Sequence, residues 1–232
     1  MDLLPFLLDM SQKEISQHAI PLWWKRREVI PCQLPPIVND YLRLDNALRC
    51  IQLAPGCIID ESLGKVLIGE GTKICHGAFI QGPAVIGSNC LVGNYSFIRS
   101  GTIIGNNVKI GFATEIKNSL IESETQIGPQ CFVSDSVICK NVYLGAQVRT
   151  SNHRLDEQHI HVRIDDIEFN TGCEKLGCYI GKGARLGIQV IILPGRHIAA
   201  NTFIGPRITV EHNLKKGRYV LKQNIYHTQG IN

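Results

Sequence analysis

Residues 68–116 read IGEGTKICHGAFIQGPAVIGSNCLVGNYSFIRSGTIIGNNVKIGFATEI, and this stretch decides the fold because an apolar residue returns in it every six positions. These residues are Ile68, Ile74, Ile80, Ile86, Val92, Ile98, Ile104, Ile110 and Ile116. A period of six fits neither the turn of an amphipathic helix, about 3.6 residues, nor the alternation of a simple strand. The fourth residue after the apolar one is mostly small, as at Thr72, Ala78 and Ala84. Small side chains at these positions allow successive turns of the chain to stack closely.

Hexads of this kind are typical of a parallel β-helix, in which three hexads form one triangular coil and successive coils lie about 4.8 Å apart. The alternative, an all-β sandwich with evenly spaced strands, does not explain nine positions in register. The pattern continues, with one residue lost before Ile121 and again before Ile138, as Ile121, Ile127, Val133, Ile138, Leu144 and Thr150. It restarts as Ile180, Leu186, Ile192, Ile198, Ile204 and Val210. We expect the shortened coils to lose their residue at a corner of the triangle.

The hexads divide the chain into three parts. Residues 49–212 form the predicted β-helix, with an insertion at about residues 151–174. Residues 1–48 contain no hexads, and we expect a short helix within Leu3–Ile20 and a proline-rich irregular segment to cap the first coil. Residues 213–232 form a strand and tail, because apolar and charged residues alternate there as in a strand that covers the open end.

Composition argues against nucleic-acid and membrane partners. The formal net charge is +4 and the pI is near 8.6, without the run of like charges that nucleic-acid arms carry. The apolar start of the chain contains two aspartates, lacks a basic region and is too short to span a bilayer. The nine cysteines form no C-x-x-C motif, and Cys90, Cys131 and Cys178 occupy small positions of the repeat. We expect reduced packing residues and therefore a cytoplasmic protein.

Polar residues break the hexad pattern at one recurring position. Gln81, Arg99 and Lys117 are spaced by 18 residues, which is one full coil, and the next member after the shortened coil is Ser134. A triangular coil places such residues in one column along one corner. Two cations one strand spacing apart repel each other unless an anion, such as a phosphate or the carboxylate of Glu115, lies between them. A fully solvated column is the alternative.

The insertion carries three histidines, His153, His159 and His161, and a long excursion from a rigid solenoid is often functional. Histidine is a zinc ligand, but no coil supplies a matching partner, so a structural or solvated role is favoured and we predict no metal site.

Two segments resemble a known family. Residues 105–135 (GNNVKIGFATEIKNSLIESETQIGPQCFVSD) and 175–195 (KLGCYIGKGARLGIQVIILPG) look like the left-handed β-helix domain of the bifunctional N-acetylglucosamine-1-phosphate uridyltransferase/glucosamine-1-phosphate acetyltransferase. The match is closest to archaeal-type sugar-phosphate nucleotidyltransferases with acetyltransferase tails, and covers roughly residues 66–222. No Gly-rich phosphate loop precedes the hexads in this sequence, so we expect the nucleotide-transferring half to be missing.

The resemblance implies a homotrimer that uses acetyl-CoA and binds a sugar phosphate or nucleotide sugar. It implies that Arg99 and Lys117 hold the phosphate, the same two residues that the 18-residue spacing selects, and that Asn152 lies at the site. Gln81 joins them as a substrate-binding candidate from the column. The residues implied to contact acetyl-CoA, in a groove between subunits, are Ala146, Gly187, Ile188 and Gly205.

Three departures from the family concern the chemistry. The positions of its catalytic histidine, a neighbouring tyrosine and a further asparagine are occupied by Pro129, Phe132 and Tyr143. Proline cannot accept a proton, and His153, beside Asn152, is the nearest candidate base by sequence. We therefore predict an acyl-CoA-dependent acyltransferase, with two alternatives: a catalytically impaired binding or assembly subunit, and a zinc enzyme of the γ-carbonic-anhydrase kind, for which histidines on adjacent coils are not found.

Overall fold

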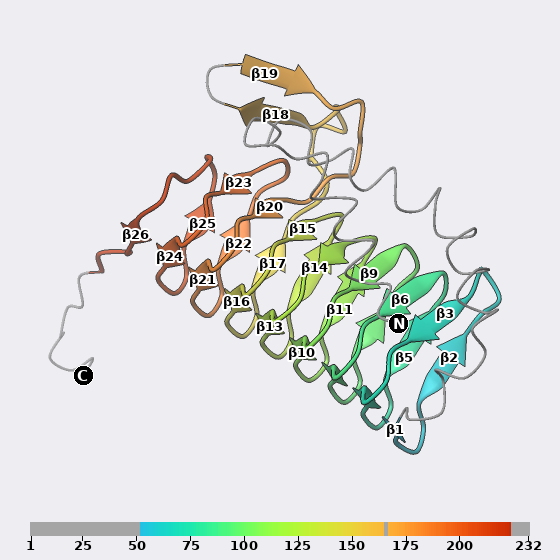
Figure 1. Cartoon of the computed structure of the whole chain (residues 1–232). Coiled ribbons are helices and arrows are strands. Elements are labelled where there is room, and N and C mark those ends of the chain that lie inside the picture. The colour runs from blue at the N-terminus through green and yellow to red at the C-terminus, as the bar shows by residue number, and fades with distance from the viewer. Residues whose placement is uncertain (1–51, 165–166, 224–232) are drawn as a thin grey trace, which may run out of the picture.

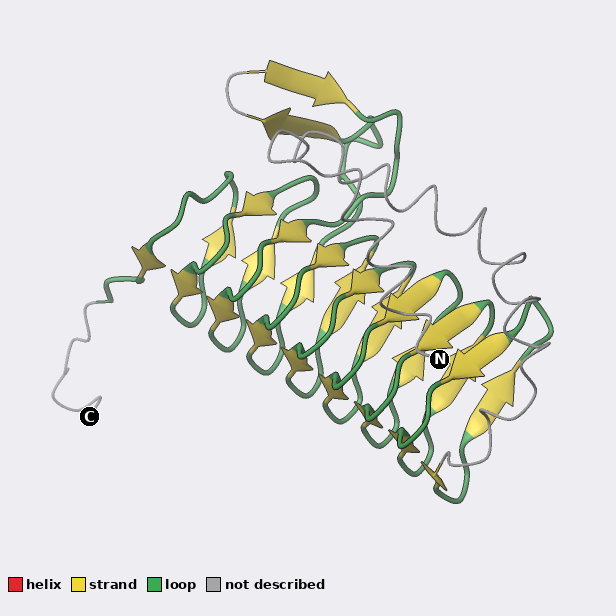
Figure 2. Cartoon of the chain, in the orientation of Figure 1, coloured by secondary structure: helices red, strands yellow, loops and turns green. Residues whose placement is uncertain are grey.

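The computed structural model describes residues 52–164 and 167–223, which form an all-β parallel β-helix (Figure 1). This confirms the left-handed parallel β-helix predicted from the hexads and the family resemblance. No helix occurs in the described part, which consists of short strands joined by turns (Figure 2). The cap predicted within residues 1–48 lies outside the described residues.

Three parallel sheets form the three sides of the triangular β-helix. Sheet A contains β1 (Gln52–Leu53), β4 (Lys73–Ile74), β7 (Leu91–Val92), β10 (Lys109–Ile110), β13 (Gln126–Ile127), β16 (Tyr143–Leu144), β21 (Arg185–Leu186), β24 (Phe203–Ile204) and β26 (Arg218–Tyr219). Sheet B contains β2 (Ile58–Asp60), β5 (Phe79–Gln81), β8 (Phe97–Ile98), β11 (Glu115–Lys117), β14 (Phe132–Ser134), β17 (Arg149–Thr150), β22 (Ile191–Ile192) and β25 (Thr209–Val210). Sheet C contains β3 (Val66–Ile68), β6 (Ala84–Ile86), β9 (Thr102–Ile104), β12 (Leu120–Ile121), β15 (Val137–Ile138), β20 (Tyr179–Ile180) and β23 (His197–Ile198). The chain visits the sheets in the order A, B, C, so each coil has an AB, a BC and a CA corner.

The hexad residues fill the interior. Ile74, Ile80 and Ile98 are fully buried, and the stack continues to Val210. Small residues at the corners also point inward and pair with the next coil: Thr72 Oγ1 donates to the carbonyl of Gly87 over 2.6 Å. Each apolar layer therefore rests on the next, and the backbone ladder joins every coil to its neighbours.

The outer face of sheet C is apolar and, unlike the outer faces of the other two sheets, buried. Its residues Leu67, Val85, Ile103, Leu120 and Val137 are buried in a second cluster, which also contains residues of the insertion. The insertion includes an antiparallel hairpin of β18 (His161–Ile164) and β19 (Ile167–Asn170), seen above the coils in Figure 1.

The shortened coils lose their residue at a corner, as predicted, and the strand register identifies it as the BC corner. Ile116 pairs with Ile98 in sheet B, and Ile121 pairs with Ile104 in sheet C, so the missing residue lies between these strands. At the tightened corner Asn118 adopts a positive φ of 44°. Asparagine and aspartate tolerate this conformation better than most residues.

The seven cysteines in the described part are free thiols. Burial raises the pKa of Cys131 to about 11 and that of Cys178 to about 12, so both are protonated packing residues at neutral pH. The described residues include no helix long and apolar enough to cross a membrane. Cytoplasmic location stays a prediction.

Candidate functional site

The strand register brings the predicted polar residues into one column at the BC corner. Phe97 pairs with Glu115 and Ile98 with Ile116, so Arg99 and Lys117 follow side by side. Lys117 in turn pairs with Ser134. Gln81 ends β5, the strand paired with β8 on the other side, so it stands in the same column before Arg99.

Arg99 already has an anionic partner. Its Nη1 donates to Glu115 Oε1 over 2.9 Å, and its guanidinium lies over the Phe97 ring, 5.7 Å from the centroid. Both charged side chains are a little over one third exposed. A pair this accessible contributes little to stability, about 0–1 kcal/mol, and can be broken by a ligand.

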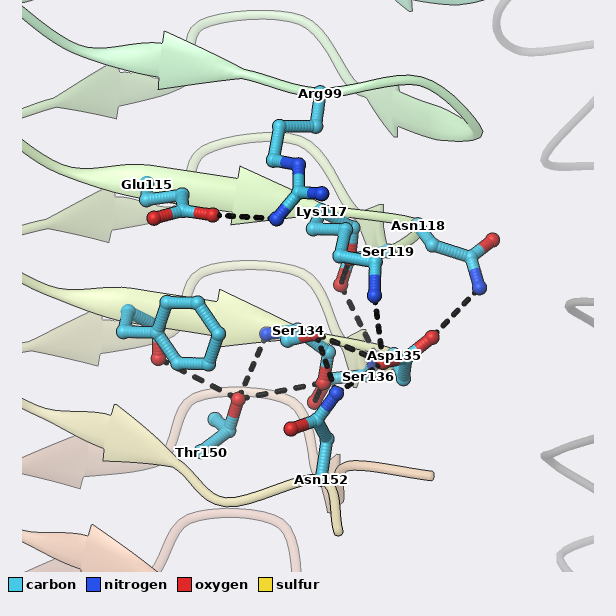
Figure 3. A network of polar contacts seen from close by, with 11 residues as sticks. Arg99, Glu115, Lys117, Asn118, Ser119, Ser134, Asp135, Ser136, Thr150 and Asn152 are labelled. Carbon is cyan, nitrogen blue, oxygen red and sulfur yellow. Dashed lines mark hydrogen bonds and ion pairs between the residues drawn. The ribbon is translucent and has the colours of Figure 1, made fainter. Parts of the chain in front are cut away.

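Below this pair, a buried carboxylate organises a polar network (Figure 3). Asp135, whose side chain is 3% exposed, accepts hydrogen bonds from Asn118 Nδ2 at 2.7 Å, Ser134 Oγ at 2.8 Å and Asn152 Nδ2 at 2.6 Å. Lys117 Nζ lies 4.0 Å from Asp135 Oδ2. The network thus joins Lys117 and Asn152, which come from different coils, through one side chain.

Asn152 lies where the insertion leaves the coil. Its carbonyl accepts a hydrogen bond from the Leu176 amide at 2.9 Å, so the chain returns to the same corner. His153 follows at once, forms an isolated antiparallel bridge with Lys175, and is exposed. The proposed base therefore stands at the neck of the insertion, beside the network but not hydrogen bonded within it.

The residues implied to contact acetyl-CoA lie on a different edge, the AB corner. Gly187 and Gly205 directly follow β21 and β24, which pair with each other, and Ile188 follows Gly187. Ala146 follows β16 by two residues, as Ile188 follows β21, and it therefore occupies the position equivalent to Ile188 one coil earlier. Pro129 stands one coil earlier again, after β13. Pro129, which the resemblance aligns with the family's catalytic histidine, therefore lies at the same corner as the residues implied to contact acetyl-CoA.

A cleft of about 650 Å³ opens on the outer face of sheet A beside this corner. Its lining residues are Tyr143, Arg185, Leu186, Gly187, Phe203, Ile204, Gly205, Pro206, Arg218, Tyr219 and Val220. It includes two of the four predicted groove residues, Gly187 and Gly205; Ala146 and Ile188 are outside the lining. A Cβ added to Gly187 would stand 2.8 Å from the Pro206 nitrogen, so glycine allows the two coils to approach closely at this corner.

Several residues of these two patches were not predicted from the sequence. They are Asn118 and Asp135 in the network, and Arg185, Phe203 and Arg218 in the cleft. Tyr143, Arg185 and Phe203 each precede a hexad residue of sheet A, so they form one outward row, and this periodicity could have identified them. Asp135 has a weaker signal, an aspartate at a shortened corner.

The described residues contain no group of three or more His, Cys, Asp or Glu side chains placed to bind a metal ion. The expectation that the chain binds no metal stays a prediction.

Comparison with known proteins identifies the family. A family model described as bacterial transferase hexapeptide (six repeats) matches residues 65–100 and 83–118. An uncharacterized acetyltransferase, YaiX, from Escherichia coli O6:K15:H31 (strain 536 / UPEC) is 60% identical over 228 residues, which are 98% of this chain and 99% of that protein. The chain therefore belongs to the hexapeptide-repeat acetyltransferases.

A second relative confirms the resemblance to the archaeal bifunctional enzymes. The bifunctional sugar-1-phosphate nucleotidylyltransferase/acetyltransferase of Sulfurisphaera tokodaii is 37% identical over 156 residues, 67% of this chain and 39% of that protein. Among solved structures, a putative acetyltransferase from Bacillus cereus has a TM-score of 0.49 and 18% identity, over 65% of this chain and 78% of that chain.

Proposed function

We propose that the chain transfers an acyl group from acetyl-CoA, or a related acyl-CoA, to a sugar phosphate or nucleotide sugar. The observation that carries this proposal is the grouping of Arg99, Lys117 and Asn152 at one corner. Two cations on adjacent strands suit the oxygens of a phosphate, and an amide beside them can orient the attached sugar. The Sulfurisphaera tokodaii relative, named for a sugar 1-phosphate, supports this class of acceptor.

The phosphate would enter a site that is already balanced in charge. Arg99 faces Glu115, and Lys117 faces Asp135. Because the Arg99–Glu115 pair is partly exposed, a phosphate can replace Glu115 as the partner of the guanidinium. Asp135 is buried and keeps its contacts, so Lys117 would be shared between Asp135 and the phosphate.

Acyl transfer also needs a base. The amine or hydroxyl of the acceptor attacks the thioester carbonyl carbon, the C–S bond breaks, and CoA leaves while the nucleophile gives up its proton. Pro129 cannot take this proton. We assign the role to His153, because its exposed imidazole directly follows Asn152.

The cleft on sheet A fits the proposed co-substrate. Tyr143 and Phe203 expose 42% and 53% of their surface and offer aromatic faces to a base ring, while Arg185 and Arg218 offer positive charge to phosphates. Asn141 Oδ1 accepts a hydrogen bond from Arg185 Nη2 at 3.1 Å and so restrains this guanidinium. Acetyl-CoA, when bound, supplies the activated acyl carbonyl.

We further propose that the site is completed by neighbouring copies of the chain in a trimer. The polar network lies at the BC corner, and the cleft lies on sheet A beside the AB corner. Sheet B separates the two, so one copy does not bring them together by itself. The AB corner also exposes apolar rings: Tyr95 packs edge-on against Phe112, and the two are 56% and 49% exposed. We take this exposed apolar contact as support for an association surface at the AB corner. Light scattering should give about three times the chain mass of 25.8 kDa.

The alternative is a sugar-phosphate-binding or assembly subunit without turnover. Pro129 at the family's histidine position favours it, since the rest of the site persists without that base. A thiol-release assay with acetyl-CoA and a panel of amino sugars, sugar phosphates and nucleotide sugars separates the two functions. Acceptor-dependent release of CoA, lost in Lys117→Ala, is expected. Calorimetric binding of a panel member without release of CoA would support the binding subunit, and no binding of any panel member would refute both.

A further inference from the structure

We infer that Asp135 is the positioning residue of the acceptor site, fixing the amide of Asn152 and the ammonium of Lys117 in the arrangement that the substrate meets. The importance of this arrangement for binding rests on the proposed function, whereas the arrangement itself can be tested without substrate. No family motif quoted above assigns a role to this aspartate.

The contacts of Asp135 exceed what a corner aspartate needs for the turn alone. Its backbone amide donates to the Lys117 carbonyl at 3.0 Å, and its carbonyl accepts from the Gly177 amide at 2.8 Å, which already holds the corner. The side chain in addition accepts hydrogen bonds from Asn118, Ser134 and Asn152. A buried carboxylate requires such compensation, and this one obtains it from three successive coils.

The carboxylate also decides which way the Asn152 amide faces. Nδ2 of Asn152 donates both to Asp135 Oδ2 at 2.6 Å and to Ser134 Oγ at 3.0 Å. The opposite orientation would place the amide oxygen against a carboxylate oxygen, two acceptors in contact. Oδ1 of Asn152 therefore points away from Asp135, as Figure 3 shows, and is presented as a hydrogen-bond acceptor.

The same oxygen, Oδ2 of Asp135, attracts the Lys117 ammonium from the other side at 4.0 Å. Lysine has a long flexible side chain, and fixing it in one place costs conformational entropy. The attraction to Asp135 restrains the Lys117 side chain before the substrate binds, so less conformational entropy is lost on binding. The side chain is still 25% exposed and can be reached by a ligand. The acceptor substrate thus meets a cation for its phosphate and an acceptor for its N–H or O–H, both set by one carboxylate.

The first test uses no ligand: crystal structures of the full chain and of its Asp135→Asn variant. An amide at position 135 has one acceptor oxygen for two asparagine amides and carries no charge. We expect Lys117 Nζ to move away from position 135 and the Asn152 side chain to rotate. If both side chains keep their positions, Asp135 does not position them.

The second test measures binding by calorimetry, with glucosamine 1-phosphate and acetyl-CoA as separate probes. In Asp135→Asn the Kd of glucosamine 1-phosphate should rise about tenfold or more, the usual effect of losing hydrogen bonds to a charged group, with an unchanged Kd for acetyl-CoA. Glu122→Gln is the matched control, because Glu122 is a buried carboxylate at the CA corner that accepts from the Lys140 amide at 2.8 Å. It should change neither Kd.

A second, milder variant keeps the inference testable if Asp135→Asn does not fold. Ser134→Ala removes the hydroxyl that donates to Asp135 and accepts from Asn152, and it should raise the Kd of glucosamine 1-phosphate several-fold without affecting acetyl-CoA. Equal Kd values in Ser134→Ala, Asp135→Asn and the unmodified chain would overturn the inference. If the unmodified chain binds no glucosamine 1-phosphate, the proposed function loses its support, while the crystal structures still decide whether Asp135 positions Lys117 and Asn152.

Discussion

Arg99 reaches across to the neighbouring strand and donates from Nη1 to Oε1 of Glu115 over 2.9 Å. The residue assigned to the phosphate of the substrate is therefore paired within the chain. The two side chains are 38% and 35% exposed, so solvent weakens their attraction.

Glu115→Gln should strengthen binding of a sugar phosphate, because the guanidinium no longer has to leave an anionic partner. We expect the Kd of glucosamine 1-phosphate, measured by calorimetry, to fall about two- to fivefold, in line with the worth of an exposed ion pair. Glu124→Gln, which removes the partner of Lys140 at another corner, is the control and should leave the Kd unchanged. Weaker binding in Glu115→Gln would show instead that Glu115 orients Arg99.

Lys117→Met should abolish most sugar-phosphate binding, since it deletes the cation beside Asp135 and leaves that buried carboxylate without its ammonium. We expect a rise in Kd of about tenfold to a hundredfold. Lys109→Met serves for comparison, because Lys109 is an exposed lysine on the outer face of sheet A. Similar affinities in the two variants would remove Lys117 from the site.

Arg218→Ala tests the cleft on sheet A. Loss of a guanidinium that faces phosphate should raise the Kd of acetyl-CoA about tenfold and reduce the dependence of binding on salt. Arg207→Ala is the control, because Arg207 lies outside the lining and pairs with Gln223. Calorimetry at two salt concentrations measures both effects, and an unchanged Kd in Arg218→Ala would place acetyl-CoA elsewhere.

Ile104→Ala should lower the free energy of unfolding by about 2–5 kcal/mol, because this side chain is fully buried in the stack and its loss leaves a cavity. Leu91→Ala, on the outward face of β7 with 37% exposure, should cost clearly less. Urea unfolding followed by circular dichroism compares the two. Equal costs would mean that the interior relaxes around the cavity.

Stability should also fall in alkaline solution through the buried thiols. Burial raises the pKa of Cys131 from its ordinary value of 9.0 to about 11 in the folded chain. Folding therefore favours the protonated thiol, a contribution that is complete below pH 9 and is lost as the pH rises from about 9 to about 11. Cys131→Ala should flatten the decline of the unfolding free energy over this range. A decline of the same slope in both proteins would assign it to other groups.

The sequence predicted the β-helix because the buried interior needs one apolar residue in every six, and this period holds without a slip from Ile68 to Ile116. The column of Arg99 and Lys117 was predictable for the same reason, since a spacing of 18 is one coil. Asp135 was missed because its importance comes from side-chain contacts between coils, which no period encodes.

The base of the proposed reaction could not be fixed from sequence for a different physical reason. Pro129 excludes the family's position, but His153 belongs to an insertion whose path does not follow the hexads. Sequence adjacency to Asn152 was the only available guide. The row of Tyr143, Arg185 and Phe203 could have been found from the hexads, but the insertion separates Tyr143 from the other two, and the strand register is what shows that the three are neighbours.

The missing residue at the BC corner has a consequence for how this chain can change. Asn118 is the counterpart of Gly101, but it follows Ile116 by two residues, whereas Gly101 follows Ile98 by three. Inserting one amino acid between Lys117 and Asn118 would therefore restore a full-length hexad, and it would alter the corner at which the Lys117 ammonium lies 4.0 Å from Asp135 Oδ2. A lengthened variant could thus keep a sound scaffold and still lose ligand recognition.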